Sequence, residues 1–514
     1  MKKIIILILC LLLLCGCHKN VDKIDDNYRV FYEIFVGSFS DSDGDGIGDL
    51  KGIINRLDYL NDGNVDSDSS LHVQGLWLSP IFKAGSYHKY DVIDYYSIDP
   101  HFGNMDDLKK LVDEAHKRNV KVILDMVINH TSNQNEWFRE YSKARLNEDT
   151  QNKYYNYYTT ETRDTLRPDR SYNIVGSSKK WWYECNFSHE MPELNFDNEE
   201  VRQEVLNIAK YYIDLGIDGF RFDAAKYIYF NNNKESIMFW DWYVEELKKM
   251  KEDIYLVGEV WSSESETNQY IKSLNCFNFT SAGSEGIIAS TAKGQNINSF
   301  TNYVTNYLTK IHSQNSEAMY IPFIANHDTD RCAGYLTVSS KDAYMAANLY
   351  ILCSGSPFIY YGEEIGLKGT RGGANTDANR RLAMLWGDQD TIKDPVGADF
   401  GNEKQVNGTV SDQIKNEDSL LRYYNKVIKF RNKYPQIARA TYEKIDLKNT
   451  KVGGFKLTYN DEISYLIHNI AKEEMTIDIS SLGEFEFIDY IGQGEAKLDG
   501  TNLIIGPQTS LILK

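Results

Sequence analysis

Short runs of apolar residues recur between residues 30 and 361, and stretches with a helical period of polar and apolar positions separate them. Strands that alternate with helices are typical of repeated β-α units and of a parallel sheet. Eight such runs predict an α/β fold, a closed (β/α)8 TIM barrel with its active site at the carboxyl ends of the strands. The predicted strands span residues 30–35, 75–78, 120–127, 219–223, 254–260, 277–280, 320–325 and 357–361.

Two parts of the chain depart from this pattern. The gap between the third and fourth strands is rich in Tyr, Trp, Asn and Asp and has little helical period. A structureless loop of that length is uncommon in a compact domain, so we expect a small domain, residues 131–198, inserted over the barrel mouth. The barrel itself then comprises residues 28–130 and 199–438. Residues 439–514 alternate in strand fashion, which predicts an all-β C-terminal sandwich with strands at 452–458, 463–468, 475–479 and 503–513.

The N-terminus has the pattern of a targeting signal. Two lysines precede the unbroken apolar run 4–14, which is too short to span a bilayer and predicts a signal peptide at residues 1–16. The run ends in LCGC, which resembles a bacterial lipoprotein box and implies cleavage before Cys17 and lipid attachment there. A plain secretory peptide is the alternative. Residues 17–27 would form a tether, and the protein would be exported and held at the outer face of the bacterial cell membrane.

The amino-acid composition indicates which classes of binding partner to expect. A formal net charge of −18 argues against neutralisation of phosphates, so nucleic acid is not an expected partner. The 36 tyrosines and 8 tryptophans supply flat faces that suit sugars. No obligate protein partner is evident. The four cysteines after Cys17 have no paired spacing and predict neither a disulfide framework nor a zinc site; they are Cys185, Cys276, Cys332 and Cys353.

Carboxylates stand at or just beyond the ends of three predicted strands, namely Asp223, Glu259 and Asp328. Arg221 shares a strand face with Asp223 and would keep that carboxylate ionised, although a structural ion pair explains this pair equally well by itself. Three such positions, each beside Arg, Trp or His, favour a catalytic site. Cleavage of an acetal with retention requires one carboxylate nucleophile and a second, protonated carboxyl group.

Four segments, residues 125–130, 221–223, 258–261 and 326–328, resemble the four motifs of the α-amylase family of retaining glycoside hydrolases, glycoside hydrolase family 13. Residues 191–195 (MPELN) are similar to the family's fifth motif and residues 355–363 to its eighth strand. The similarity extends from about residue 28 to the end of the chain. It implies that Asp223 is the nucleophile, Glu259 the general acid/base, and Asp328 the carboxylate that holds the sugar hydroxyls. The substrate-binding residues that it implies are His88, Tyr90, His130, Arg221, Lys226 and His327.

The fifth motif is intermediate between the oligo-1,6-glucosidase and neopullulanase types, as in lipoprotein α-amylases of the family. Exo-acting glucosidases of the family have an acidic residue where this chain has His88, which favours internal cleavage. The Lys-His pair usual after the nucleophile is Lys226-Tyr227 here, which leaves the contacts on the leaving-group side open.

The resemblance therefore implies a retaining, endo-acting α-amylase that hydrolyses α-1,4-glucosidic bonds in starch, maltodextrins and maltooligosaccharides. A cyclomaltodextrinase/neopullulanase-like or oligo-1,6-glucosidase-like hydrolase is one alternative. A non-catalytic glycan-binding or transporter-associated protein is another.

The loop after the first predicted strand reads DSDGDGIGD, with acidic residues at alternate positions and glycines between them. Oxygen ligands in this arrangement suit Ca²⁺, although a metal-free acidic turn is the alternative. An EF-hand loop would have a glutamate at its twelfth position, where this chain has Gly52. The resemblance to oligo-1,6-glucosidase-like and neopullulanase-like members implies a calcium loop in which the Ile47 carbonyl is a ligand. The predicted metal site comprises Asp41, Asp43, Asp45, Ile47 and Asp49.

Overall fold

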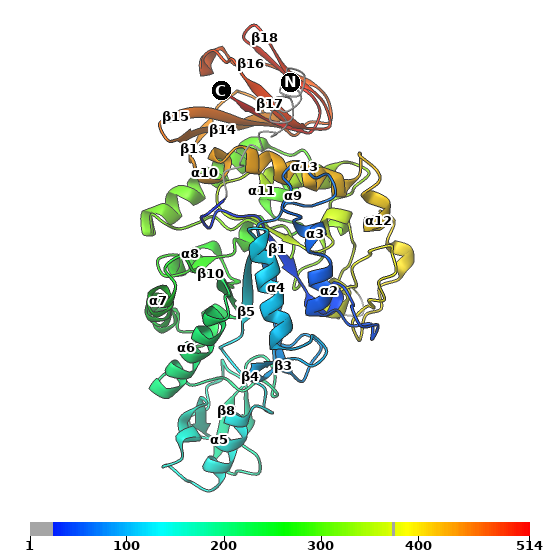
Figure 1. Ribbon diagram of the computed structural model, residues 1–514. Helices are drawn as coiled ribbons and strands as arrows, with labels where there is room; N and C mark the ends of the chain where they lie inside the picture. The colour runs from blue at the N-terminus through cyan, green and yellow to red at the C-terminus, as the bar shows by residue number, and fades with distance from the viewer. Residues whose placement is uncertain (1–23, 373–375) are drawn as a thin grey trace, which may run out of the picture.

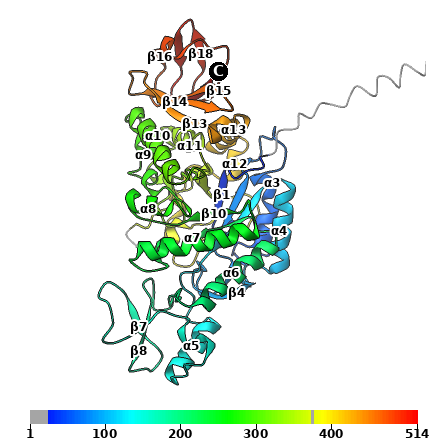
Figure 2. The same ribbon diagram turned by 90° about the vertical axis from the view of Figure 1, so that its left-hand side faces the viewer.

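The computed structural model describes residues 24–372 and 376–514. A barrel occupies the middle of the molecule, with the C-terminal sheets at one end and the inserted segment at the other (Figures 1 and 2). Within the described residues, no helix combines the length and the apolar character needed to cross a bilayer. The predicted signal peptide, residues 1–16, and the lipidation site Cys17 lie outside the described residues and stay predictions.

Seven parallel strands form one curved sheet, and six of them confirm predicted strands. The strands are β1 (Phe31–Ile34), β2 (Gly75–Leu78), β5 (Lys121–Met126), β9 (Gly219–Phe222), β10 (Tyr255–Gly258), β11 (Asn275–Cys276) and β12 (Phe358–Tyr360). Their order in the sheet is β11-β10-β9-β5-β2-β1-β12. The barrel fold predicted from the sequence is therefore confirmed.

The sixth predicted strand, residues 277–280, is wrong in position. The strand is β11, which ends at Cys276. Residues 279–281 form the 3₁₀ helix η4 (Phe279–Ser281), because the side chain of Asn278 accepts a hydrogen bond from the Ser281 N–H and caps the turn.

The seventh predicted strand, residues 320–325, forms no regular strand but still closes the barrel. Ile321 accepts a hydrogen bond from the Asn278 N–H at 3.0 Å, and Pro322 accepts one from the Phe358 N–H at 2.9 Å. Pro322 has no N–H of its own to donate, which limits the ladder to the single bridge between Phe323 and Phe358.

Residues that face the barrel interior follow the two-residue period of the strands. The interior layers nearer the amino ends of the strands are apolar, and Phe31 and Ile123 belong to one buried cluster there. Two positions further toward the carboxyl ends, the same faces carry Glu33 and Asp125, both buried. Along β1 and β5, the side chains that face the interior are therefore apolar near the amino end and ionisable near the carboxyl end, where an active site is expected.

Helices cover the outside of the sheet and share its main apolar core. The longer ones are α4 (Met105–Lys117), α6 (Glu199–Asp214), α7 (Asn233–Met250), α10 (Ile297–Gln314), α11 (Asp342–Ile351) and α13 (Leu420–Lys433). The shorter ones are α2 (Leu50–Asn55), α3 (Leu57–Leu60), α8 (Glu264–Tyr270), α9 (Ile287–Ala292), α12 (Val410–Gln413) and α14 (Gln436–Arg439). Asn104 and Asn198 are the N-caps of α4 and α6. The Asn104 side chain accepts hydrogen bonds from two free N–H groups of the first turn, and the Asn198 side chain accepts one.

The segment between β5 and α6 forms a separate small unit at the end of the molecule (Figure 1). It contains α5 (Glu136–Leu146) and a three-stranded antiparallel sheet of β6 (Thr160–Thr162), β8 (Trp181–Glu184) and β7 (Tyr172–Ile174), in that order. Phe138 of α5 packs edge-on against Tyr158 and Tyr183. An insertion after the third barrel strand is therefore present, as predicted.

Two antiparallel sheets form the C-terminal unit and enclose their own apolar core, which confirms the predicted sandwich. The larger sheet contains β13 (Thr441–Ile445), β14 (Val452–Tyr459), β15 (Glu462–Asn469), β20 (Thr509–Leu513) and β17 (Ile488–Gly492). The smaller contains β16 (Met475–Asp478), β19 (Asn502–Ile505) and β18 (Ala496–Asp499). The predicted strand 503–513 is in fact two strands in different sheets, because Pro507 lies between them and cannot donate to a ladder.

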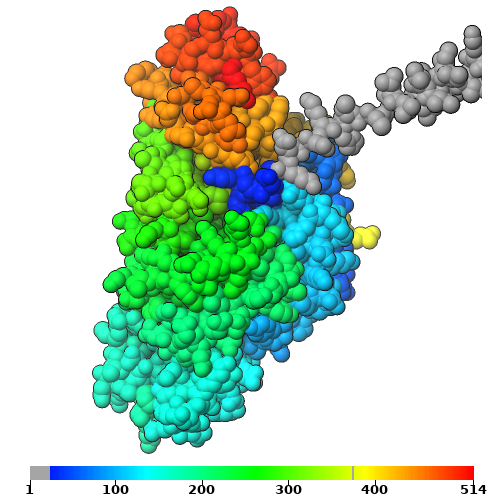
Figure 3. All heavy atoms as spheres, turned by 60° about the vertical axis from the view of Figure 1, so that its left-hand side comes forward, coloured from blue at the N-terminus to red at the C-terminus, as the bar shows by residue number. Residues whose placement is uncertain are grey.

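The first described residues lie against the folded protein, although residues 17–27 are predicted as a tether. They are the dark blue atoms at the surface in Figure 3. Asp26 forms an ion pair with Arg439 at 2.6 Å, and the Arg29 guanidinium donates to the Ile24 carbonyl at 2.5 Å. The folded part of the chain thus begins a few residues before β1.

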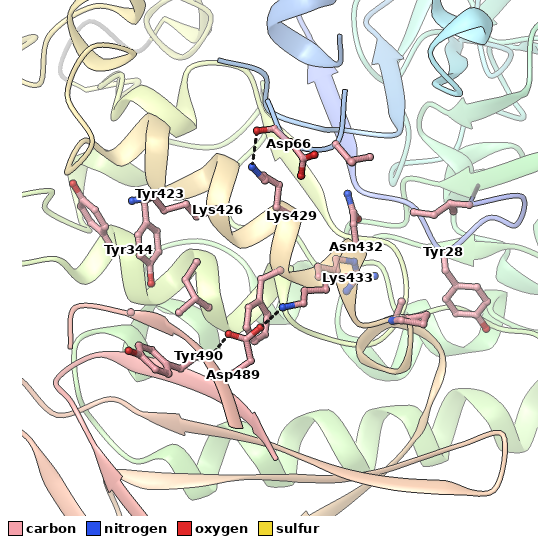
Figure 4. Close-up of a pocket in the computed structure, with 18 of the residues that line it drawn as sticks. Tyr28, Asp66, Tyr344, Tyr423, Lys426, Lys429, Asn432, Lys433, Asp489 and Tyr490 are labelled. Atoms are coloured by element: carbon pink, nitrogen blue, oxygen red, sulfur yellow. Dashed lines mark hydrogen bonds and ion pairs between the residues drawn. The ribbon is translucent and has the colours of Figure 1, made fainter. Parts of the chain in front are cut away.

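A groove of about 1290 Å³ runs between α13, β17 and these first residues (Figure 4). Its lining includes Tyr28, Tyr490 and the ion pair of Lys433 with Asp489, whose atoms are 2.7 Å apart. Tyr28 precedes β1, so the groove lies at the amino ends of the barrel strands. It is therefore not the cavity in which a barrel active site is expected.

Candidate active site

One buried guanidinium contacts side-chain carboxyl groups at the carboxyl ends of three strands. Arg221 is 1% exposed and lies directly opposite Asp125 in the register of β9 and β5. Its Nη1 is 2.9 Å from Asp125 Oδ1 and 2.8 Å from Asp223 Oδ1, and its Nη2 is 3.1 Å from Glu259 Oε2. The sequence predicted the pairing with Asp223 but not the sharing of one cation by three carboxyl groups.

A second centre is formed by His327 and Asp328, in the segment that closes the barrel. His327 Nδ1 is 2.5 Å from Glu33 Oε1, and Nε2 is 2.9 Å from Asp328 Oδ2. Burial disfavours the charged ring, but Asp328 and Glu33 raise the pKa of His327 to about 10. The imidazolium is therefore positive at neutral pH, and both of its nitrogens contact protein groups.

Tyr90 joins the two centres. Its hydroxyl accepts from His327 Nε2 at 2.7 Å and donates to Asp125 Oδ2 at 2.9 Å. The phenol ring is stacked on the imidazole, with centroids 5.7 Å apart and an angle of 16° between the planes. The Tyr90 ring is thus fixed by contacts with both Asp125 and His327.

Arg381 is a site residue that the sequence reading missed. Its Nη2 is 2.7 Å from Asp328 Oδ1, its Nε donates to the His327 carbonyl at 3.1 Å, and its Nη1 donates to the Tyr87 hydroxyl at 3.0 Å. Burial opposes ionisation of Asp328, but His327 and Arg381 hold the pKa of that carboxyl well below its usual range. Asp328 is therefore a carboxylate with one oxygen on each cation.

The whole cluster contains more acidic than basic groups. The carboxyl groups are Glu33, Asp125, Asp223, Glu259 and Asp328, and the cations are Arg221, His327 and Arg381. Buried charge without a partner is costly, so a neutral cluster requires protons on two of the carboxyl groups. Burial raises the pKa of Asp125 to about 7 and also raises the pKa of Asp223 and of Glu259, with Arg221 opposing the shift in each.

Asp223 and Glu259 differ in how they contact Arg221. The guanidinium donates a hydrogen bond to Asp223, whereas its contact with Glu259 is an ion pair of longer distance. Hydrogen bonds to the charged form favour it, so the charge is better stabilised on Asp223. Glu259 Oε2 instead accepts a hydrogen bond from the backbone N–H of Ala224 at 3.0 Å.

His88 and His130 are neutral histidines at the rim of this cluster. Burial lowers the pKa of each to about 4. His88 Nδ1 accepts from the Tyr90 N–H at 3.1 Å, so the proton of the neutral ring is on Nε2. Within the described part of the chain, the buried Nε2 of His130 has no hydrogen-bond partner. Both rings can therefore meet a ligand hydroxyl.

Lys226 lies apart from the buried cluster. It is half-buried in the 3₁₀ helix η3 (Ala225–Tyr227), and its Nζ lies 4.9 Å from the centroid of the Tyr227 ring. Of the predicted binding residues, the structure thus brings five together around the carboxyl groups, and Lys226 extends the site outward.

Three of the carboxylates predicted as metal ligands lie close together in the loop after β1. Oxygens of Asp41, Asp43 and Asp49 lie within 4.8 Å of one another. Two ligands about 2.4 Å from one Ca²⁺ can be no further apart than this, so the three fit a shared calcium ion. Asp45 is not part of this group, and its Oδ1 accepts from the Ile47 N–H at 2.7 Å.

Comparison with known proteins agrees with this geometry. The family description "Alpha amylase, catalytic domain" matches residues 33–440. The chain belongs to the alpha-amylase family. It is 36% identical over 489 residues to Alpha-amylase 3 of Dictyoglomus thermophilum, covering 94% of this chain and 93% of that protein.

Two further proteins are similar to this chain over most of its length. The structure of Eubacterium rectale Amy13B superimposes with a TM-score of 0.87 at 35% identity and covers 95% of each chain. The Oligo-1,6-glucosidase of Bacillus cereus is 29% identical over 533 residues, covering 88% of this chain and 91% of that one. The protein is thus an alpha-amylase family glycoside hydrolase, and similarity to both kinds of enzyme agrees with the predicted intermediate character.

Proposed function

We propose that the protein is a retaining, endo-acting α-amylase that cleaves α-1,4-glucosidic bonds in starch, maltodextrins and maltooligosaccharides. The observation that carries this proposal is the contact of one guanidinium, that of Arg221, with both Asp223 and Glu259. It favours the separation of about 5–5.5 Å between the two carboxyl groups of retaining enzymes over the wider spacing of inverting ones.

In the first step, the Asp223 carboxylate forms a bond to the anomeric carbon while the glycosidic C–O bond breaks. The bonding electron pair leaves with the glycosidic oxygen, which takes the proton of Glu259. In the second step, the Glu259 carboxylate takes a proton from water, the water oxygen attacks the same carbon, and the bond to Asp223 breaks. Two inversions at one carbon give net retention.

Asp328 accepts hydrogen bonds from sugar hydroxyls and stabilises the positive charge that develops on the ring. Its own charge is held in place by His327 and Arg381, so it does not reorganise during the reaction. The ring of Tyr90 stacks below the sugar, and His130 Nε2 supplies a hydrogen bond that no described protein group takes.

The neutral His88 supports internal cleavage. A pocket that ends behind the first sugar needs a group that pairs with the terminal hydroxyls, because unpaired hydroxyls lose hydrogen bonds to water. A neutral imidazole cannot make the charge-assisted contact that a carboxylate makes. We expect a maltoheptaoside blocked at its non-reducing end to be cut at a rate within about threefold of the unblocked sugar, measured by product chromatography.

The alternatives give different products. An oligo-1,6-glucosidase-like enzyme would release glucose stepwise from unblocked chains and would leave the blocked sugar intact, which would contradict endo action. A cyclomaltodextrinase/neopullulanase-like enzyme would open cyclodextrins or pullulan faster than amylose. With all three catalytic carboxyl groups in place, nothing favours the non-catalytic alternative.

Calcium at the loop after β1 is part of the proposal. Asp41, Asp43 and Asp49 would hold the ion, which would supply two positive charges among the three carboxylates. Asp41 Oδ2 also accepts from the Thr391 hydroxyl at 2.6 Å, so the loop is joined to the segment after β12 that carries Arg381. The ion would therefore stabilise the site indirectly.

Chelation with EDTA is expected to lower the melting temperature by several degrees, because a ligand at about 100 times its Kd stabilises the folded state by roughly 2.7 kcal/mol. In Asp43→Ala the ion is already lost, so EDTA should cause no further change. Asp45→Ala is the matched control, since each side chain accepts one backbone hydrogen bond within the loop. An EDTA response in Asp43→Ala equal to that of the wild type would show that the site is wrong.

A further inference from the structure

The groove between α13 and β17 lies at the other end of the barrel strands from the candidate active site. Tyr28, which lines it, precedes β1, whereas the catalytic carboxyl groups stand at the carboxyl ends of the strands. Its volume of about 1290 Å³ is larger than the roughly 300–1,000 Å³ typical of small-molecule sites. The groove is therefore separate from the reaction site and has room for a long ligand.

A second hollow, of about 490 Å³, continues the groove past the end of α13. Lys433, Pro435 and Tyr459 line both hollows. Phe487, which directly precedes β17, lines the second one only. The two hollows are here named the rear groove, and their continuity suits a chain ligand better than a compact one.

Two exposed aromatic rings lie in the rear groove. Tyr490 of β17 is 38% exposed in the first hollow, and Phe487 is 42% exposed in the second. Three residues of extended chain span at most about 11 Å, so both rings can contact one ligand at different points. Aromatic rings in the wall of a groove offer flat apolar faces against which sugar rings can pack.

An ion pair fixes the polar groups beside these rings. Asp489 Oδ2 is 2.7 Å from Lys433 Nζ, and the two side chains meet between β17 and α13 (Figure 4). Asp489 also accepts from the Tyr434 hydroxyl at 2.5 Å and from the Tyr490 N–H at 2.9 Å. An ammonium has three N–H donors, so Lys433 can still donate to the hydroxyl group of a ligand.

The charge of the rear groove favours an uncharged ligand. Its larger hollow is lined by six acidic and six basic side chains, in a chain whose formal net charge is −18. Among them, Lys433 pairs with Asp489 and Arg439 pairs with Asp26. Nucleic acid and an anionic lipid surface both attract an excess of positive charge, which this lining does not have. A neutral ligand rich in hydroxyl groups fits the lining better.

We propose that the rear groove is a second α-glucan-binding site, which holds the polymer away from the catalytic carboxyl groups. The inference rests on the proposed function for the identity of the polymer. Binding at two places on one polymer raises the local concentration of cleavable bonds at the active site. The gain is therefore large for starch granules and absent for a sugar too short to reach both sites.

The test compares two substrates on each variant, starch granules and p-nitrophenyl α-maltotrioside. The measured quantity is the rate on granules divided by the rate on the trioside. We expect this ratio to fall about fivefold in Phe487→Ala and in Tyr490→Ala, the loss typical of one aromatic contact. Loss of folded protein lowers both rates alike and leaves the ratio unchanged. Sedimentation with granules, in the Asp223→Asn background, should show the same loss of binding without hydrolysis.

Two controls isolate the ring contact. Tyr490→Phe keeps the ring and should keep the wild-type ratio. Tyr96→Ala removes an aromatic side chain of similar exposure, 41%, that does not line the rear groove, and it should also keep the ratio. An unchanged ratio in either groove alanine variant would overturn the inference alone. No cleavage of either substrate by the wild type would refute the proposed function, and sedimentation with granules would still decide the inference.

Other occupants of the rear groove would give other results. Alanine variants that keep granule binding but lose binding to phosphatidylglycerol vesicles would assign the groove to a lipid surface. Variants that keep granule binding but change the oligomeric state in analytical ultracentrifugation would assign it to a second copy of the chain. Either result would overturn the inference.

Discussion

Asp223→Asn is expected to lower kcat/KM for maltooligosaccharides by a factor on the order of 10⁴ or more, the scale on which loss of a nucleophile acts in other covalent catalysts. The amide cannot form the glycosyl ester, and the uncharged group no longer matches the guanidinium beside it. Arg221 keeps its contacts with Asp125 and Glu259, so the buried cation is not left alone. The variant should therefore fold, and the loss should be in catalysis.

The measurement combines initial rates with covalent labelling. A maltosyl fluoride with a second fluorine on the reacting ring, which slows release, should label the peptide that contains Asp223 in the wild type and leave the variant unlabelled. Asp94→Asn, on the strand β4 (Val92–Ile98), is the matched control and should keep wild-type rates. Label on another carboxylate, or substantial activity in Asp223→Asn, would contradict the assigned nucleophile.

The strand pattern was sufficient to predict much of the barrel and the positions of its reactive residues. Alternation places every second residue on one face, so Arg221 and Asp223 follow from β9 alone. The pattern failed where a local polar group or proline overrides it. Asn278 caps a turn where a strand was predicted, and Pro322 removes the donor that a ladder needs.

The features of the site that the sequence did not predict depend on contacts between segments that are distant in the chain. Arg381 lies in a long irregular segment after β12, and nothing around it in the sequence indicates a partner at Asp328. The pairing of Arg221 with Asp125 depends on the register between two strands separated by a whole inserted unit. The alternating pattern alone also does not show which of the loop's carboxylates converge, since Asp41, Asp43 and Asp49 lie together while Asp45 is not part of that group.

Glu259→Gln is expected to lower kcat/KM for maltooligosaccharides by about 10²–10⁴-fold, the usual contribution of a positioned general acid. Fluoride leaves without a proton, so α-maltosyl fluoride should still give a rapid burst of one fluoride per enzyme. Turnover should then stall, because no base activates water. Added azide needs no base, so it should restore turnover and give α-maltosyl azide. Absence of both the burst and the rescue would show that Glu259 is not the acid/base.

The pH dependence of the same variant tests which carboxyl group gives up the proton. Burial raises the pKa of Glu259, and the protonated form is the active acid, so wild-type kcat/KM should fall as pH rises through that pKa. The amide of Glu259→Gln does not titrate, and the alkaline limb should disappear from its residual activity.

Asp125 is the competing donor, since burial raises its pKa to about 7 and Tyr90 joins it to His327. The apparent pKa values in such a profile belong to the whole cluster of coupled carboxyl groups. The variant removes Glu259 from that cluster and so distinguishes its proton from that of Asp125. An alkaline limb that persists in Glu259→Gln would assign the proton to Asp125, and the roles proposed for the two strand ends would have to be revised.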